Sequence, residues 1–146
     1  MSSVFSDIPE EEWIDSNDHA FAVYDKHPVT DGHILIISKR EFPSWFVAEP
    51  EEEQAIFHLL DKMEAYVKEK YDPDGFNIGI NVGKAAGQTV DHFHVHLIPR
   101  YEGDIDDPRG GVRNVLPERG NYLESDVENW QETAPSGKAT AAVDKV

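Results

Sequence analysis

The sequence predicts an α+β fold, an antiparallel sheet of about five strands with one long helix and a shorter one packed on a face. Three observations lead to this prediction. Apolar or alternating segments recur at residues 19–24, 33–38, 76–82 and 90–98, as expected for strands. One long segment from residue 50 carries apolar residues at helical spacing instead. The chain has 146 residues, of which 39% are hydrophobic, enough for one packed core.

The first two predicted strands are joined by a polar loop. Residues 19–24 (HAFAVY) form the first strand, and residues 33–38 (HILIIS) form the second. The second strand is almost continuously apolar, which indicates burial on both of its faces. Between them, Pro28 and the pair Asp31-Gly32 mark a loop. This order favours an antiparallel pair.

The long helix is predicted to begin at Pro50 and to end before Pro73. Proline suits the first helical turn, where its missing N–H would be unpaired in any case. Three glutamates, residues 51–53, follow it where the helix dipole favours negative charge. One apolar stripe runs along the segment, formed by Ile56, Leu59, Leu60, Met63 and Val67.

The last two predicted strands flank a glycine-bearing turn. Residues 76–82 and 90–98 alternate apolar and polar side chains, and residues 83–88 (GKAAGQ) separate them. We predict one catalytic domain over residues 1–120 and a C-terminal extension, residues 121–146, whose composition is typical of a flexible tail towards its end.

The charge balance excludes several classes of partner. With 13 Lys and Arg against 29 Asp and Glu, the net charge is −16. Such a chain is unsuited to long nucleic acid or to an anionic membrane surface. The absence of cysteine excludes disulfides and thiolate metal sites. The acidic N-terminus resembles no secretory signal, and no apolar run reaches the ~20 residues that cross a bilayer. We therefore expect a cytoplasmic protein.

Three of the seven histidines lie in one short window, at His92, His94 and His96. On a strand, this spacing puts all three on one face, in a row ~13 Å long. Neutral imidazoles are nucleophiles, and protonated ones donate hydrogen bonds to anions. A polar strand face and a metal site are the alternatives, but the outer pair is too far apart to close around one ion, so a metal would need two histidines and an acid.

The segment before the histidines favours an anion site. Gly87 permits close backbone approach, while Gln88 and Thr89 offer an amide and a hydroxyl. Beside the imidazoles, these groups suit a phosphate.

The segment 88–97 (QTVDHFHVHL) resembles the signature of the histidine triad superfamily of nucleotide hydrolases and transferases. That signature is His-x-His-x-His with apolar x, preceded by Gly-Gln-Ser/Thr-Val. The resemblance covers roughly residues 10–100, and residues 107–118 are similar to an extension of bacterial members related to diadenosine polyphosphate hydrolases. It implies a histidine triad fold, a small-molecule nucleotide substrate and a homodimer.

The resemblance also implies a mechanism. His94 would attack the α-phosphate of an adenosine nucleotide, giving a covalent nucleotidyl-histidine that water hydrolyses. His96 and His33 would line the phosphate, and His92 would help to orient His94. Gln88, Thr89 and Val90 belong to the signature's nucleotide-binding part, with Gln88 and Thr89 facing the phosphate or the leaving group.

Two further positions match nucleotide contacts of the family. Asp25 lies where an Asp or Asn binds the ribose hydroxyls, and Asn81 where an Asn or Gln contacts the nucleotide. The substrate would be a dinucleoside polyphosphate or a phosphoramidate. No cofactor or metal bound by the protein is expected, although Mg²⁺ can accompany the substrate as its counter-ion.

Three other functions stay open from the sequence: a nucleotidyl transferase, a nucleotide-binding regulator with little turnover, and a metalloprotein that uses the histidine row. A polyanionic substrate also needs a local positive site in this acidic chain. Lys39, Arg40, Lys84 and Arg100 flank the motifs and are the candidates for it. Arg109 and Arg113 would either reach a polyphosphate or pair with acids at a subunit interface.

Overall fold

The computed structural model describes residues 2–123. The chain divides after Asp104 into two compact units. Residues 105–120, which the sequence analysis assigned to the catalytic domain, belong to the second unit. The predicted C-terminal extension lies outside the described residues from residue 124 onwards.

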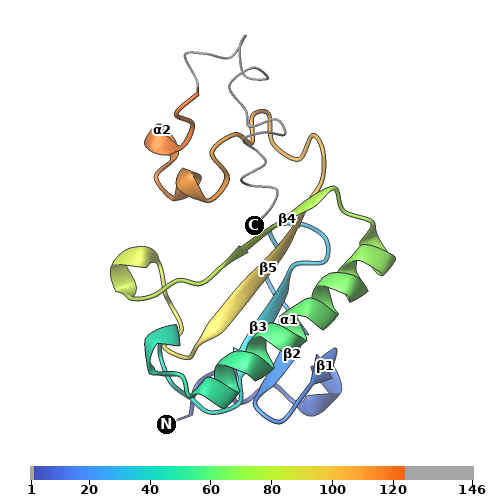
Figure 1. Cartoon of the computed structure of the whole chain (residues 1–146), viewed down its shortest axis with the longest axis vertical. Coiled ribbons are helices and arrows are strands. Elements are labelled where there is room, and N and C mark those ends of the chain that lie inside the picture. The colour runs from blue at the N-terminus through green and yellow to red at the C-terminus, as the bar shows by residue number, and fades with distance from the viewer. Residues whose placement is uncertain (1, 124–146) are drawn as a thin grey trace. The chain divides into compact units, whose positions relative to one another are not determined.

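The first unit contains the predicted antiparallel sheet. It has five strands in the order β1-β2-β3-β5-β4 (Figure 1), and every neighbouring pair is antiparallel. This confirms the predicted fold class. The strands are β1 (Asp15–Ser16), β2 (Ala20–Tyr24), β3 (Ile34–Ser38), β4 (Gly75–Gly79) and β5 (His94–Arg100).

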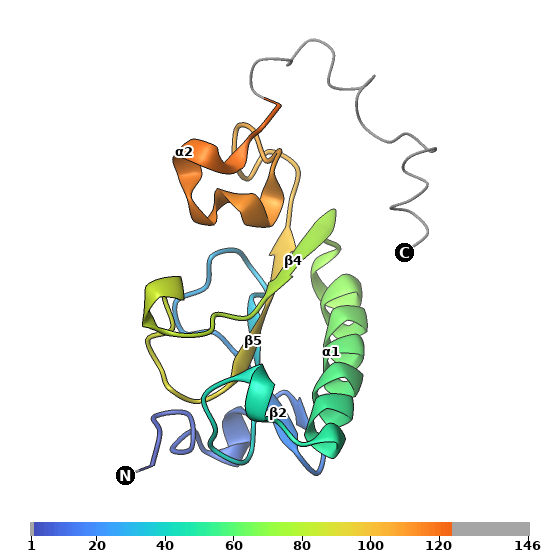
Figure 2. The ribbon, with the colours of Figure 1, turned by 60° about the vertical axis from the view of Figure 1, so that its left-hand side comes forward.

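The helix α1 (Pro50–Tyr71) lies along one face of the sheet (Figure 2). A capping box between Glu49 and Glu52 pairs the free N–H groups of its first turn. The helix ends at Asp72, which adopts the left-handed conformation with φ 52°. The predicted stripe is buried against the sheet, except that Leu60 is only partly buried.

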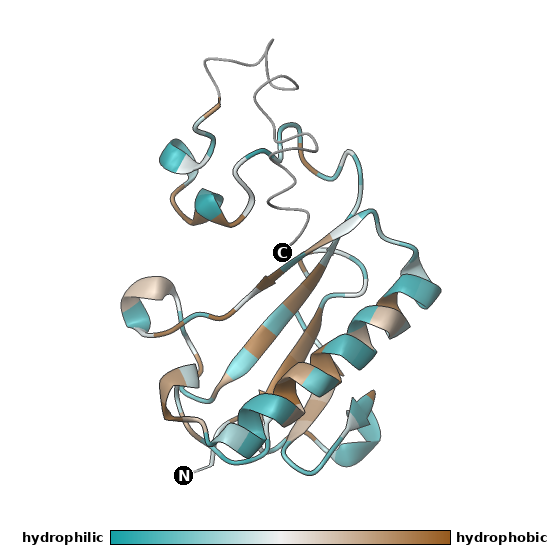
Figure 3. Ribbon diagram, viewed as in Figure 1, coloured by the Kyte–Doolittle hydropathy of each residue, from teal (hydrophilic) through white to brown (hydrophobic). Residues whose placement is uncertain are grey.

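Strand β3 is hydrophobic and buried along its whole length, as its apolar composition predicts (Figure 3). Ile34 and Ile36 pack towards α1, together with Val95 of β5. Leu35 and Ile37 point to the opposite face, where residues of the N-terminal segment, Phe5, Ile8 and Trp13, cover them. One face of β3 is therefore covered by α1, and the other face is covered by the N-terminal segment.

Two predicted strands have different bounds in the structure. β4 ends at Gly79, so residues 80–82 lie outside it, and β5 begins at His94 rather than at residue 90. The Phe93 N–H donates to Phe42 O at 2.6 Å, which ties residue 93 to the segment after β3. β5 also runs two residues further than predicted, to Arg100, and so includes Pro99, which lies beyond the β3 pairing that stops at the pair Ile34–Leu97.

Other helical segments are short. The first unit holds, besides α1, only 3-10 turns such as Trp45–Val47 among its described residues, so the shorter helix predicted on the sheet is not found there. The second unit contains a 3-10 segment, Gly111–Val115, and the four-residue α2 (Pro117–Gly120). Within it, Arg113 Nε–H donates to Gly120 O at 3.0 Å. No helix in residues 2–123 has the length and apolar character needed to span a bilayer.

Candidate active site

A pocket of about 440 Å³ lies on the face of the sheet opposite α1. Val23 of β2 and Leu35 of β3 form its floor, and both belong to the apolar cluster of that face. Most of the residues predicted to form the site line this pocket, namely Asp25, Asn81, Thr89, Val90, His94 and His96. Segments far apart in the sequence therefore meet here, as the predicted function requires.

The alternation of β5 places two of the three triad histidines in this pocket. His94 and His96 line it, while Val95 and Leu97 belong to the core beneath α1. This is the period of two that a strand imposes on its side chains.

His92, the remaining histidine of the predicted row, does not line the pocket. It precedes β5, and its side chain is fully buried. Its Nε2–H donates to Ser38 O at 2.7 Å, and its Nδ1 lies 2.8 Å from Ser3 Oγ. The Phe5 ring nevertheless contacts both His92 and His94, with centroids 5.6 and 4.9 Å apart, so His92 lies on the same side of the sheet, just before the strand begins.

The His94 ring has a defined tautomer. Its Nδ1 lies 2.8 Å from the carbonyl oxygen of His92. A carbonyl can only accept, so Nδ1 carries the proton and Nε2 holds a free lone pair. Burial lowers the pKa of His94, although the hydrogen bond to His92 opposes this effect. His94 is therefore a neutral imidazole at pH 7, and Nε2 bonds to no described residue.

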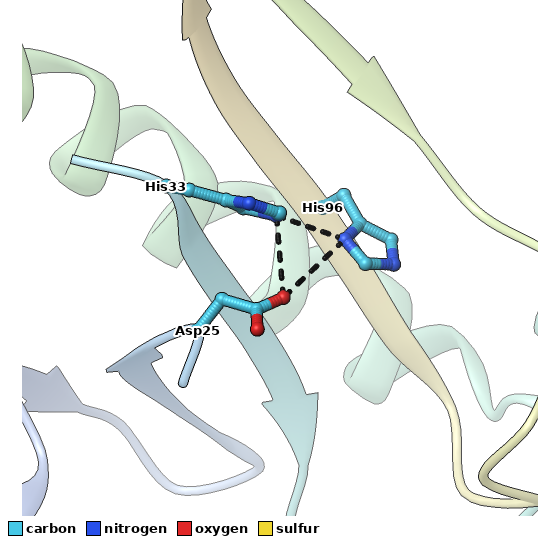
Figure 4. Close-up of side chains that lie close together, drawn as sticks. All are labelled: Asp25, His33 and His96. Carbon is cyan, nitrogen blue, oxygen red and sulfur yellow. Dashed lines mark hydrogen bonds and ion pairs between the residues drawn. The ribbon is translucent and has the colours of Figure 1, made fainter. Parts of the chain in front are cut away.

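His33 and His96 form a pair of neighbouring rings next to Asp25 (Figure 4). The Val29 N–H donates to His33 Nδ1 at 3.0 Å, so the His33 proton resides on Nε2. That Nε2 lies 3.0 Å from His96 Nδ1 and donates to it. His96 must then carry its own proton on Nε2. The backbone thus fixes the tautomers of both rings.

Both rings of this pair are neutral at pH 7. Burial lowers the pKa of His33. Burial, followed by the repulsion that a protonated His96 would feel from the His94 and His33 rings when these are also protonated, lowers the pKa of His96 to about 4. The negative charge of Asp25 opposes both shifts, because its Oδ2 lies 3.4 Å from His33 Nε2 and 4.0 Å from His96 Nδ1. His96 is consequently a neutral hydrogen-bond donor whose ring centroid lies 5.2 Å from that of His94.

The side chains of Asp25, His33 and His96 lie close enough together to raise the question of a metal ion. The ligand atoms of Asp25, His33 and His96 lie within 4.8 Å of one another. A metal-bound imidazole usually donates an N–H from its other nitrogen. His33 Nδ1 instead accepts the Val29 N–H, so Nε2 must be protonated and has no lone pair for a metal. The donor set fits a hydrogen-bond relay better than a metal site.

Gln88 has a different position from the one predicted. Its Oε1 accepts the Gly83 N–H at 2.8 Å, and its amide donates to Pro43 O and Val90 O at 2.8 and 3.1 Å. All its polar atoms are thus engaged within the loop and its neighbouring connector. Gln88 does not line the pocket and supports Thr89 and Val90, which do.

The residues predicted to form a local positive site do not lie at the pocket. None of Lys39, Arg40, Lys84 and Arg100 lines the pocket. Both arginines are paired, Arg40 with Glu52 at 2.8 Å and Arg100 with Asp104 at 2.7 Å. Among the described residues, the pocket is lined instead by one cationic side chain, Lys26, which was not predicted, and by the two carboxylates of Glu12 and Asp25. Arg113 bonds within the second unit, and Arg109 pairs with Asp107 there.

The site matches a known family. The family model described as HIT domain matches residues 9–103, which include every histidine of the pocket. The chain belongs to the HIT family. Its solved relatives share the fold: a HIT family protein from Bacillus anthracis has a TM-score of 0.66 and 32% identity, covering 86% of this chain and 94% of that one.

Two curated HIT proteins show the range of the family's assignments. A HIT-like protein of Mycoplasma pneumoniae is 33% identical over 81% of this chain and 77% of its own length. A bis(5'-adenosyl)-triphosphatase of Dictyostelium discoideum is 33% identical over 68% of this chain, which spans 66% of that enzyme. Some relatives of this HIT protein are thus diadenosine polyphosphate hydrolases.

Proposed function

We propose that this HIT protein hydrolyses adenosine nucleotides at the α-phosphate, through a covalent nucleotide on His94. The observation that carries the proposal is the free Nε2 lone pair of a neutral, buried His94 beside the Nε2–H of His96. The relationship to a bis(5'-adenosyl)-triphosphatase supports dinucleoside polyphosphates as substrates. A phosphoramidate is cleaved by the same chemistry.

The proposed first step uses both histidines. His94 Nε2 forms a bond to phosphorus while the bond from phosphorus to the leaving oxygen breaks, and that oxygen takes the electron pair. The His94 ring becomes cationic, and the His92 carbonyl, 2.8 Å from Nδ1, stabilises the new charge. The His96 Nε2–H stabilises the negative charge on the phosphoryl oxygens. Water then attacks phosphorus, releases the mononucleotide and restores neutral His94.

The rest of the pocket suits a nucleoside. Its apolar part, including Val23 and Leu35, can hold a base. Asp25 accepts the His27 N–H through Oδ1 at 2.8 Å, and its Oδ2 lies 3.4 Å from His33 Nε2. Lone pairs of this carboxylate that face the pocket can accept ribose hydroxyls.

Asp25→Ala is expected to raise KM for a ribonucleotide about tenfold, since hydrogen bonds to a charged group are lost. For the 2′,3′-dideoxy analogue, KM should change much less, because those hydroxyls are already absent. Steady-state kinetics with the matched pair of substrates measures this difference. Equal losses for the two sugars would contradict the ribose contact.

No metal or cofactor is proposed for the protein itself, and Mg²⁺ would arrive bound to a polyphosphate substrate. We expect protein purified without an affinity tag to contain well below one zinc or iron per chain. Hydrolysis of a nucleoside phosphoramidate, which needs no Mg²⁺, should be unchanged after chelation. Stoichiometric zinc, with activity lost on chelation and restored by zinc, would favour the metalloprotein alternative.

We further propose that the protein is a homodimer. β4 pairs only with β5 among the described residues, so its other edge is open to a strand of a second chain. Ile78 on this strand and Ile80 and Val82 after it are exposed. Sedimentation equilibrium tests the association, and a monomer at micromolar concentration would contradict it.

A further inference from the structure

The N-terminal arm, residues 3–8, forms one wall of the pocket. Val4, Phe5 and Ile8 line it, and Phe5 and Ile8 pack on the apolar cluster of the sheet. The Phe5 ring meets the His94 ring edge-on, with centroids 4.9 Å apart. The arm therefore contacts the proposed nucleophile as well as the space for the substrate.

Glu41 fastens this arm from the segment after β3. Its Oε2 accepts the Ser3 N–H at 3.0 Å and also the hydroxyl of Ser6. These bonds, with that of the Ser6 hydroxyl the largest cause, lower the pKa of Glu41. The carboxylate is thus ionised at neutral pH. It accepts hydrogen bonds from Ser3 and Ser6, the two ends of the arm's first turn.

The fastened arm continues into the triad. Ser3 Oγ lies 2.8 Å from His92 Nδ1 and accepts the Phe5 N–H at 2.9 Å. Because His92 Nε2–H donates to Ser38 O, a neutral His92 accepts the Ser3 hydroxyl proton at Nδ1. The His92 carbonyl in turn accepts from His94. A continuous set of bonds therefore joins Glu41, Ser3, His92 and His94.

We propose that Glu41 is a positioning residue that holds the N-terminal arm against His92, so that the apolar wall is complete and Phe5 fixes the His94 ring. Glu41 touches neither the pocket nor the reacting atoms and acts through Ser3 and Ser6. The identity of the ligand rests on the proposed function, whereas the attachment of the arm does not. Loss of Glu41 should weaken nucleotide binding more than it slows the chemical step.

The test compares Glu41→Ala with two other variants. Glu41→Gln keeps an oxygen that can accept both hydrogen bonds, and Glu69→Ala removes the same charge from an exposed position on α1. Hydrogen–deuterium exchange of the arm is measured together with AMP affinity by calorimetry and with kcat and KM for diadenosine triphosphate. Thermal unfolding of each variant serves as a check on folding.

In Glu41→Ala, the arm amides should exchange about tenfold faster, and Kd for AMP and KM should rise about tenfold with a smaller change in kcat. Glu41→Gln should restore both readouts, and Glu69→Ala should change neither. Unchanged exchange in Glu41→Ala would overturn the proposal, as would faster exchange with unchanged AMP affinity. If the wild type cleaved no adenosine nucleotide, the proposed function would fail, while exchange and AMP affinity would still decide the role of Glu41.

Discussion

The His94→Ala variant should release nucleotide at a rate lower by a factor on the order of 10³ or more, because the residue that forms the covalent bond is gone. The ring faces the pocket, and Val95 and Leu97 remain in the core, so the fold should persist. Product release from diadenosine triphosphate or a phosphoramidate, followed by chromatography, measures the loss. Circular dichroism establishes that the variant is folded.

His58→Ala is the matched control for this substitution. His58 is exposed on α1 and lies outside the pocket, so its loss should leave turnover within about twofold of wild type. A folded His94→Ala protein that keeps most of its activity would remove His94 from the nucleophile role. Equal losses in the two variants would point to general damage instead.

The pH dependence should show an acid limb displaced below the range of an ordinary imidazole. His94 must be neutral to attack, so kcat/KM falls as protons are added. An unperturbed imidazole titrates near ~6.5. Burial lowers the pKa of His94 and brings that of His96 to about 4, so activity should persist to lower pH. We expect a plateau above pH ~6.5 and a fall of about tenfold per pH unit below the lowered pKa.

Stability must be followed in the same pH series. A histidine whose pKa is lower in the folded protein stabilises the fold above its unfolded pKa, and this contribution is lost as the pH falls from ~6.5 towards the folded value. Only points at which the protein is folded by circular dichroism enter the profile. A rate that stays flat down to pH 4 in folded protein, or an acid limb centred above pH 7, would contradict a neutral, buried His94.

The local patterns of the sequence were sufficient for the long helix and for four of the five strands, whereas the two-residue β1 is too short to show a pattern. The stripe of α1 and the continuous apolar run of β3 reflect burial, which repeats with the period of each element. The same period placed His94 and His96 together on one face, opposite Val95. Asp25 was found through the resemblance, since a single acid after a strand carries no local signal of its own.

The features that the sequence did not reveal depend on tertiary contacts. The position of His92 depends on hydrogen bonds from Phe93 to Phe42 and from His92 to Ser38, which no local spacing encodes. The Gln88 amide is held away from the pocket by its hydrogen bonds to the carbonyls of Pro43 and Val90. The N-terminal arm, including Phe5, has too few apolar residues to show a period, and only the folded sheet shows that it covers the pocket.

The covalent intermediate is the most direct test of the account. Wild-type protein is mixed with excess diadenosine triphosphate, quenched in alkali during turnover, digested and analysed by tandem mass spectrometry. We expect adenylate on His94 in the wild type and in His58→Ala, and none in His94→Ala. A regulatory protein without turnover would give no adduct, and a transferase would form the adduct but release it to a second substrate rather than to water. Steady turnover to AMP with no adduct on His94, or with adenylate on another residue, would contradict the account.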